Sequence, residues 1–337
     1  MRIALDAMGG DRGPDELVSG ALLAIRDADV EVVLVGDETM LRSVLSAKGV
    51  SEGSRLSVTH ASQVVEMHDN AVDAIRKKRD SSILVACNLV ARGEAAAVVS
   101  AGHSGATLAA AVRKMGRLEG VSRPGLASFF PTIKKPVVLM DIGGNVDCRP
   151  RHLLQFAIMA AAFASIHECE NPRIGLLSIG EEAGKGNALI KDAYPLLAAS
   201  SLNFIGNVEG RDIFQGDVDV VVCDGFVGNI CLKVSEGLAA AAMRMLGDEI
   251  RKSFWAKLGY LLAKPAFRAF KKRVDYVEYG GAPILGIDGV ALVCHGKSDA
   301  ETIQNAILVA NKMVVGGVNE QIRREISGVP LADTDDE

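Results

Sequence analysis

The amino-acid sequence predicts an α/β protein, in which a mostly parallel sheet is covered by helices on both faces as an α/β/α sandwich. Short apolar runs typical of buried strands alternate with helical stretches along the chain. Alanine, valine, leucine and 35 glycines dominate the composition, which suits buried parallel strands and close helix packing. With 337 residues, 49% of them hydrophobic and 4% aromatic, the chain is long enough to build a sizeable core.

Strand-like runs recur along the first two thirds of the chain. We expect one α/β domain over residues 1–329, followed by a short acidic tail, residues 330–337, that is disordered. A glycine-dense stretch after residue 279 is expected to complete the core with further strands and turns. The predicted strands are, in order, Arg2–Asp6, Val30–Val35, Leu56–His60, Ala96–Ser100, Gly125–Phe130, Val137–Asp141, Arg173–Ile179 and Asp217–Cys223.

Five of these strands are followed by a turn that contains glycine. Ligands on parallel sheets bind beyond the carboxyl ends of the strands. Several such turns at one edge of the sheet would line a concave floor with backbone donors for phosphate or an oxyanion, provided that the strands are parallel and adjacent. The turns read AMGGDRGPDE after Asp6, AGHSGAT after Ser100, IGGNVDCRP after Asp141, GEEAGKGN after Ile179 and DGFVGN after Cys223.

The segment Arg173–Asn187, RIGLLSIGEEAGKGN, combines a strand, a glycine loop that carries Lys185, and a helix start. In this arrangement backbone N–H groups and one ammonium converge on an anion at the positive end of a helix. The spacing differs from a Walker A loop, and no G-x-G-x-x-G follows a strand, so a nucleotide triphosphatase is disfavoured. A glycine-rich connector with a solvated lysine is the open alternative.

Polar residues at the strand ends each allow more than one role. Asn229 can cap the helix that follows, or it can point its amide at a substrate oxygen. His103 can be a satisfied polar residue, or it can serve as acid, base or donor. Four aspartates in these positions can cap a helix, fix a loop or bind a metal ion, and loop-fixing is the expected role. They are Asp6, Asp11, Asp141 and Asp224.

Composition argues against several classes of protein. Six scattered cysteines without a C-x-x-C pair and six histidines without metal spacing predict reduced core thiols and no metal site. The net charge of −5 gives no reason to expect nucleic-acid binding. The N-terminus lacks the apolar region of a signal peptide, and no apolar run approaches the roughly 18 residues of a membrane span. We therefore expect a cytoplasmic protein.

The segment of residues 251–274, RKSFWAKLGYLLAKPAFRAFKKRV, has eight basic residues and no acidic one. Its apolar residues recur at helical spacing, and Pro265 is expected to break it into two short helices within a basic amphipathic excursion, residues 248–275. Such helices suggest docking on an anionic membrane surface or an acidic protein; packing on the core or across a dimer is the alternative. The expected contact residues are Trp255, Lys257, Leu258, Leu261, Leu262 and Lys264.

Seven motifs cover nearly the whole chain in order: DAMGGD (residues 6–11), SAGHSGA (100–106), MDIGGNVDCRP (140–150), IGEEAGKGN (179–187), GNVEGRDI (206–213), DVVVCDGFVGN (219–229) and YGGAPILGIDG (279–289). Together they resemble the bacterial phosphate acyltransferase family of phospholipid synthesis. The resemblance implies a Rossmann-like fold related to the phosphotransacetylase and isocitrate/isopropylmalate dehydrogenase folds.

The activity that the resemblance implies is transfer of a fatty acyl group from acyl carrier protein to inorganic phosphate, without a cofactor. The family is a homodimer that associates peripherally with the inner face of the cell membrane. There, a glycerol-3-phosphate acyltransferase of the membrane uses the acyl phosphate. Anionic membrane, acyl carrier protein and that acyltransferase are the implied partners.

Residues carry over where the motifs align. Lys185 and Asn229 stand where the family places residues important for activity, so Lys185 is expected to hold phosphate and Asn229 to stabilise the carbonyl oxyanion. The family often has Asn-Thr where this chain has His103 and Ser104, which leaves the role of that turn open. The implied substrate-binding residues are Gly9, Gly10, Asp11, Gly102, His103, Ser104, Gly105, Gly143, Gly144, Asn145, Gly184, Gly186, Asn187, Asp224, Gly225 and Gly228.

Two other functions remain possible from the sequence. An oxidoreductase on the related dehydrogenase fold would need nicotinamide, for which the chain carries no fingerprint. A non-catalytic scaffold at the membrane surface would explain the basic segment, but it would leave the glycine turns and Lys185 without a role.

Overall fold

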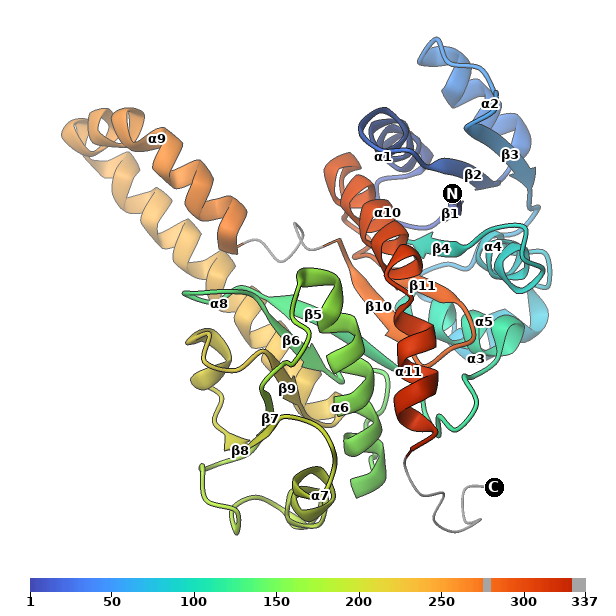
Figure 1. Ribbon diagram of the computed structural model, residues 1–337. Helices are drawn as coiled ribbons and strands as arrows, with labels where there is room; N and C mark the ends of the chain where they lie inside the picture. The colour runs from blue at the N-terminus through green and yellow to red at the C-terminus, as the bar shows by residue number, and fades with distance from the viewer. Residues whose placement is uncertain (275–279, 329–337) are drawn as a thin grey trace.

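The computed structural model describes residues 1–274 and 280–328, and the predicted tail, residues 330–337, lies outside them. The described residues form an 11-stranded sheet with helices on both faces, which confirms the predicted sandwich (Figure 1). All eight predicted strands are present. The strands are β1 (Arg2–Asp6), β2 (Glu31–Gly36), β3 (Leu56–His60), β4 (Ala97–Ser100), β5 (Gly125–Phe130), β6 (Val137–Met140), β7 (Ile174–Leu177), β8 (Phe204–Val208), β9 (Val220–Val222), β10 (Ala282–Leu285) and β11 (Val290–Val293).

The sheet contains two parallel blocks that run in opposite directions. Its strand order is β3-β2-β1-β4-β11-β10-β5-β6-β9-β7-β8. The first block consists of β3, β2, β1, β4 and β11, which are parallel to one another. The second block consists of β6, β9, β7 and β8, which are also parallel to one another. The pairings β11–β10, β10–β5 and β5–β6 are antiparallel, so the direction reverses three times. The carboxyl ends of the two blocks therefore lie at opposite edges of the sheet.

Helices cover both faces because the strands are apolar on both sides. In β7, Ile174 and Leu176 pack in one core layer and Leu177 in the other, as the two-residue period of a strand requires. The helix α6 is buried along nearly its whole length. One face carries α1 (Pro14–Asp27), α2 (Glu38–Ala47), α6 (Pro150–Ala164), α7 (Ala188–Ala198), α10 (Ala300–Val315) and α11 (Val318–Ile326); the other carries α3 (Ala71–Lys77), α4 (Ser82–Ala91) and α5 (Ser104–Met115).

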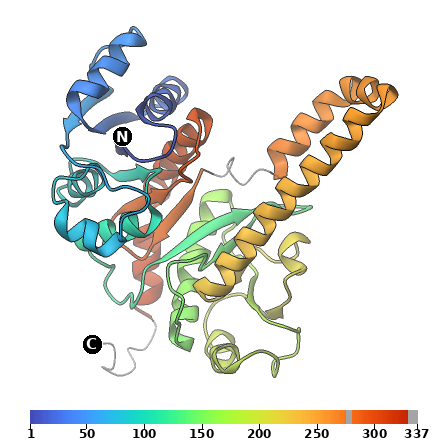
Figure 2. The ribbon, with the colours of Figure 1, turned by 180° about the vertical axis from the view of Figure 1, so that it is seen from behind.

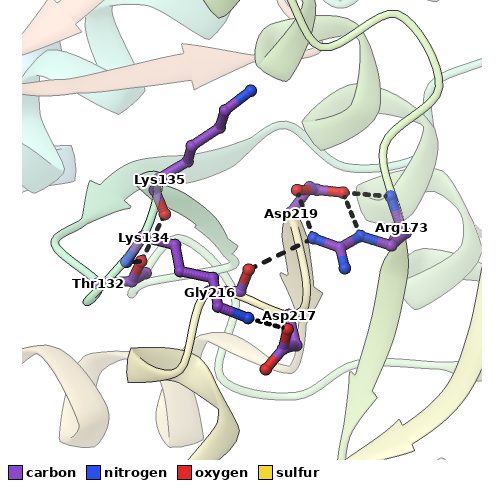
Figure 3. A network of polar contacts seen from close by, with 7 residues as sticks. All are labelled: Thr132, Lys134, Lys135, Arg173, Gly216, Asp217 and Asp219. Atoms are coloured by element: carbon purple, nitrogen blue, oxygen red, sulfur yellow. Dashed lines mark hydrogen bonds and ion pairs between the residues drawn. The ribbon is translucent and has the colours of Figure 1, made fainter.

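A polar network joins the amino ends of β7 and β9 (Figure 3). Arg173 donates from Nε to Asp219 Oδ2 at 2.9 Å and from Nη2 to Asp219 Oδ1 at 3.1 Å. Its Nη2 also donates to the Gly216 carbonyl, and Lys134 pairs with Asp217 alongside. Burial would raise the pKa of Asp219, but the hydrogen bonds from Arg173 outweigh this effect and lower the pKa. The network fixes β7 beside β9, and with them the turns at their other ends.

The helices α8 (Gly225–Lys252) and α9 (Phe254–Val274) project from the body as an arm (Figures 1 and 2). Within α8, only Gly225 and Gly228 are buried, so the arm begins well before the predicted excursion at residue 248. Among the described residues, α8 is the one helix that is long and apolar enough to cross a membrane by length and composition, although the sequence pattern predicted none. A surface helix that a partner protein covers meets the same criterion.

The predicted break at Pro265 is wrong, because α9 continues through this residue. Proline in a helix removes one hydrogen bond and introduces a steric clash, at a cost of about 3 kcal/mol. On either side of Pro265, the rings of Tyr260 and Phe267 pack with centroids 5.1 Å apart, two helical turns from each other. This contact, together with the packing of α9 along α8, offsets that cost.

Candidate active site

The glycine turns form two groups, one at each edge of the sheet, and the predicted single floor is wrong. The turns after β6, β9 and β7 lie side by side, at the edge formed by the carboxyl ends of the parallel block β6-β9-β7-β8. We call residues 141–149, 178–187 and 223–229 the second-edge group. The turns after β1 and β4 lie at the opposite edge with the turn after β11; residues 7–13, 101–105 and 294–299 are the first-edge group. The antiparallel strands β10 and β5 separate the two groups. The sequence could not predict this separation, because apolar patterning carries no information on strand direction.

The buried carboxylate of Asp141 organises the turn after β6. Its Oδ1 accepts hydrogen bonds from the N–H groups of Leu126, Gly143 and Gly144 at 2.9–3.1 Å. Its Oδ2 accepts from the backbone N–H of Asn145 at 2.6 Å and from its side-chain Nδ2 at 2.9 Å. Burial raises the pKa of Asp141, and these hydrogen bonds counteract the rise. The predicted loop-fixing role is confirmed, and the amides of Gly143 and Gly144 are already occupied by the protein's own carboxylate.

The first turn of α8 packs directly on this Asp141 turn. Asp224 caps the helix, because its Oδ1 accepts from the Val227 N–H at 2.9 Å. A Cβ on Gly225 would lie 2.6 Å from the Asn145 carbonyl oxygen, and one on Gly228 would lie 1.9 Å from the Asp141 carbonyl oxygen. These two predicted substrate-binding glycines therefore serve the close approach of helix and turn.

Asn229, the next residue of α8, has an exposed side chain. Since Asp224 takes the capping position, the capping alternative for Asn229 is wrong. A Cβ on Gly143 would lie 3.6 Å from Asn229 Oδ1, so the amide stands over the exposed Gly143 turn. It forms no hydrogen bond within the part of the chain that the structure describes, and its N–H groups can reach a bound ligand.

Lys185 lies in the loop between β7 and α7, with its side chain exposed and no ion pair to any described residue. The loop ends where Asn187 caps α7, accepting from the Ile190 N–H at 3.0 Å. Gly186 adopts φ 104°, a conformation that favours glycine. The backbone N–H groups of Gly184 and Gly186 have no acceptor among the described residues. An ammonium and free amides are thus available at the start of a helix, as the sequence predicted.

Asn207 supports this loop from β8, and the sequence analysis missed it. Its Nδ2 donates to the Glu182 carbonyl at 2.8 Å, and the Lys185 N–H donates to the same oxygen at 2.9 Å. Asn207 is 5% exposed, and its Oδ1 is buried without a partner, as is the nearby Ser178 Oγ. A polar residue inside the apolar run FIGNV was the available signal, because buried amides are retained where they fix structure.

The first-edge group is built around a second buried carboxylate, that of Asp6. Its Oδ2 accepts from Ser100 Oγ at 2.7 Å, and its Oδ1 accepts a long hydrogen bond of 3.4 Å from the Met8 N–H. Burial raises the pKa of Asp6, and its hydrogen bonds counteract the rise. A Cβ on Gly9 would lie 2.8 Å from the Gly102 backbone nitrogen, so these two predicted binding glycines pack against each other.

Two of the remaining predicted residues of the first edge, His103 and Asp11, make local contacts. His103 caps α5, because its Nδ1 accepts a hydrogen bond from the Ala106 N–H at 3.3 Å. This is the first of the two alternatives for His103, a polar residue whose hydrogen bonding is satisfied within the protein. The Asp11 N–H donates to the Gly296 carbonyl at 2.6 Å, which ties the turns after β1 and β11 together. Ser104 and Gly105 follow in the exposed first turn of α5, and Gly10 has φ 99°. The sequence analysis also missed Lys297, an exposed lysine in the turn after β11.

The second-edge group contains no activated protein nucleophile among its described cysteines. Burial raises the pKa of Cys148 to about 11, and it raises the pKa of Cys223 well above its usual value. Both are therefore thiols near neutral pH. The described residues also hold no group of three or more His, Cys, Asp or Glu side chains placed to bind a metal ion. The groups that face solvent here suit binding and polarisation of a substrate.

Comparison with known proteins identifies the relatives of this chain. A family model described as fatty acid synthesis protein matches residues 1–321. A phosphate acyltransferase from Geotalea uraniireducens is 54% identical over 327 residues, which cover 97% of this chain and 94% of the relative. The chain belongs to the phosphate acyltransferase family. A phosphate acyltransferase from Nitratidesulfovibrio vulgaris is 53% identical over 326 residues, 96% of this chain and 94% of the relative. The resemblance of the motifs is confirmed.

Solved structures similar to this family member confirm the related folds. A phosphotransacetylase from Streptococcus pyogenes superimposes with a TM-score of 0.65 at 18% identity, over 94% of both chains. EutD phosphotransacetylase from Staphylococcus aureus superimposes with a TM-score of 0.64 at 16% identity, over 93% of this chain and 94% of the other. A 4-hydroxythreonine-4-phosphate dehydrogenase from Klebsiella pneumoniae superimposes with a TM-score of 0.53 at 17% identity, over 93% of this chain and 99% of the other. At these identities the likeness concerns the fold alone.

The contact residues predicted for the basic segment lie on α9, in the arm, and not with the glycine turns. Trp255 is 76% exposed and Leu262 is 79% exposed. Large apolar side chains that are this exposed are uncommon on a protein surface without a partner. All six predicted residues are exposed: Trp255, Lys257, Leu258, Leu261, Leu262 and Lys264.

Proposed function

We propose that the chain transfers a fatty acyl group from acyl carrier protein to inorganic phosphate, forming acyl phosphate at the second-edge group. One observation carries the proposal. Lys185 and Asn229 follow neighbouring strands, are exposed, and have no partner among the described residues. Asn229 stands beside the Gly143 turn that Asp141 fixes, and Lys185 lies in the turn after β7, next but one to β6 in the sheet. The names of the relatives support the acyltransferase over the oxidoreductase and scaffold alternatives.

The chemistry requires positioning more than covalent help from the protein. Phosphate is largely anionic near neutral pH, so one of its oxygens can attack the thioester carbonyl carbon directly. Lys185 and the amides of Gly184 and Gly186 bind the phosphate, and the Asn229 amide donates to the carbonyl oxygen as it gains negative charge. The new C–O bond replaces the C–S bond, and the carrier's sulfur leaves as a thiolate that takes a proton from water.

Hydroxylamine trapping of acyl phosphate, formed from long-chain acyl carrier protein and phosphate, tests this function. We expect Lys185→Ala to reduce turnover by about 10²–10³-fold, the usual loss of a group that binds transition-state charge. Lys297→Ala is the matched control, because Lys297 is an exposed lysine in a glycine turn at the opposite edge. Loss of turnover in Lys297→Ala with full activity in Lys185→Ala would move the phosphate site to the first edge.

We propose further that α9 binds the anionic inner surface of the cell membrane, where a membrane glycerol-3-phosphate acyltransferase receives the acyl phosphate. The exposed Trp255, Leu261 and Leu262, with flanking lysines, support an interfacial helix. Flotation with vesicles that contain anionic lipid tests this proposal. Binding should weaken with salt and in the Trp255→Ser, Leu262→Ser variant. Binding that ignores anionic lipid, salt and both substitutions would contradict it.

We propose that the chain forms a homodimer and that the exposed apolar residues of α8 form its interface. Val234 is 61%, Leu238 69% and Met245 69% exposed, although each is apolar. A second copy of the chain would cover this stripe and leave α9 free for the membrane. Sedimentation equilibrium should show a dimer for the native chain and a monomer for Leu238→Glu, and a dimer that persists in this variant would place the interface elsewhere.

A further inference from the structure

A small basic hollow lies among the helices of the first block, outside both turn groups. It has a volume of about 300 Å³ and is lined by Arg79, Leu84, Arg113 and Lys114. Arg79 lies between α3 and α4, Leu84 lies in α4, and the other two lie in the last turn of α5. This volume is at the lower end of the range for small-molecule sites.

The charges around the hollow are all of one sign. Its lining contains three cations and no carboxylate. None of the three forms an ion pair with any residue that the structure describes. Like charges gathered on one surface repel each other, and the negative end of the α5 dipole offsets this only in part. A bound anion would remove the repulsion.

The geometry of the lining suits a phosphate group. The Arg113 Nη1 donates to the Ile75 carbonyl at 3.0 Å, which holds the guanidinium in place. Guanidinium groups bind phosphate oxygens in pairs, and Lys114 adds a point charge. Leu84 is 2% exposed and offers a ligand almost no surface. The volume of about 300 Å³ leaves room beside a phosphate group for a short organic group, which would lie against the aliphatic stems of the three basic side chains.

We propose that this hollow binds a small phosphomonoester with a short apolar group. Such a ligand is neither the acyl donor nor the inorganic phosphate of the proposed reaction, and the site lies on elements that contribute nothing to the second-edge group. The proposal therefore does not depend on the assignment of the reaction.

Calorimetry with butyl phosphate and with inorganic phosphate, on the Lys185→Ala protein, tests the proposal. That background removes the ammonium of the second-edge group, so binding there is suppressed. We expect butyl phosphate to bind more tightly than inorganic phosphate, because its chain fills the hollow against the aliphatic stems of the basic side chains. The double variant Arg113→Gln, Lys114→Gln should bind about 10–100-fold more weakly, since each charged hydrogen bond contributes roughly a factor of ten.

Lys77→Gln is the matched control, because Lys77 is an exposed cation in the last turn of α3 that does not line the hollow. Arg79→Gln, in the loop before α4, is a second variant that leaves the helices intact and should weaken binding about tenfold. The proposal is overturned if butyl phosphate does not bind. It is also overturned if the Arg79 and Lys77 variants weaken binding equally, or if inorganic phosphate binds more tightly than butyl phosphate.

Discussion

Each edge of the sheet carries a glycine pair that follows a buried aspartate, but the two aspartates are held very differently. Asp6 accepts hydrogen bonds from two serine hydroxyls, Ser100 Oγ at 2.7 Å and Ser82, and from the N–H groups of Met8, at 3.4 Å, and Gly9. Asp141 accepts five, at 2.6–3.1 Å, four of them from backbone N–H groups. Asp141 therefore fixes mainly backbone, whereas half of the donors to Asp6 are hydroxyls, which can rotate to another acceptor.

The second edge therefore combines a fixed turn with uncommitted groups beside it. Asn229 faces solvent next to the Asp141 turn and Lys185 faces solvent in the turn after β7, whereas His103 at the first edge is occupied in capping α5. Preorganised donors are the main source of catalytic stabilisation, because they need no rearrangement during the reaction. On the proposed function the second edge positions the substrates, and substitutions at either edge test this.

Replacement of Asp141 should have the largest effect. In Asp141→Ala, four backbone N–H groups and one amide lose their acceptor, and a buried unpaired donor costs about 1–3 kcal/mol. We expect the free energy of unfolding in urea to fall by about 3–5 kcal/mol, against about 1–3 kcal/mol for Asp6→Ala. Equal losses in the two variants would remove the contrast between the edges.

Replacement of Asn229 tests the uncommitted amide itself. Asn229→Ala should lower kcat about 10²–10³-fold, which corresponds to roughly 3–4 kcal/mol, because the oxyanion loses its donor. The melting temperature should not change, since the side chain has no described partner to lose. Asn229→Asp should be equally inactive, because a carboxylate repels the oxyanion. Normal turnover in either variant would exclude the proposed role.

Asn207 tests whether the Lys185 loop needs its support. Without the Asn207 Nδ2 contact to the Glu182 carbonyl, the loop becomes more mobile, and the KM for phosphate should rise about tenfold with little change in kcat. Asn203→Ala is the matched control, because Asn203 precedes β8 at the opposite edge. Steady-state kinetics at saturating acyl donor measure this effect. An unchanged KM would mean that the loop is fixed without Asn207.

The Arg173–Asp219 network at the far ends of β7 and β9 should affect stability but not chemistry. Because the folded-state pKa of Asp219 is lowered, its stabilisation is present above the unfolded value of about 3.9 and is lost as pH falls through the folded pKa. Asp219→Asn should lose about 1–2 kcal/mol at pH 7. Urea unfolding should show this difference shrinking below about pH 4; a difference independent of pH would contradict the assignment.

His103 should give the smallest effect. His103→Ala removes only a helix cap with a hydrogen bond of 3.3 Å, so we expect a loss of about 0.5 kcal/mol in stability. Acyl phosphate formation should stay within about threefold of the native rate. A stability loss of this size at the first edge should not change the geometry of the distant second-edge group. A large loss of turnover in a folded His103→Ala protein would show that the first edge takes part in the reaction.

The sequence by itself determined the α/β class, the position of eight strands and the identity of the glycine turns. Buried parallel strands are apolar on both faces, so their runs stand out between helices. It also gave Lys185 and Asn229 as candidates through the resemblance of the motifs, with a solvated connector lysine and a helix cap as the open alternatives. The β8 strand escaped prediction, because Gly206, with φ 104°, and Asn207 interrupt its apolar run.

Only the tertiary structure decided which turns lie together. Strand direction depends on how β10 and β5 insert between the two blocks, and this is a matter of long-range pairing that no local pattern encodes. The structure also decided that Asp141 uses the amides expected for phosphate, that Asp224 caps α8 in place of Asn229, and that α9 continues through Pro265. The Asp141 and Asp224 contacts join residues that are close in the chain, but only the folded backbone shows which of the open alternatives each carboxylate takes. The continuation of α9 depends on its packing along α8.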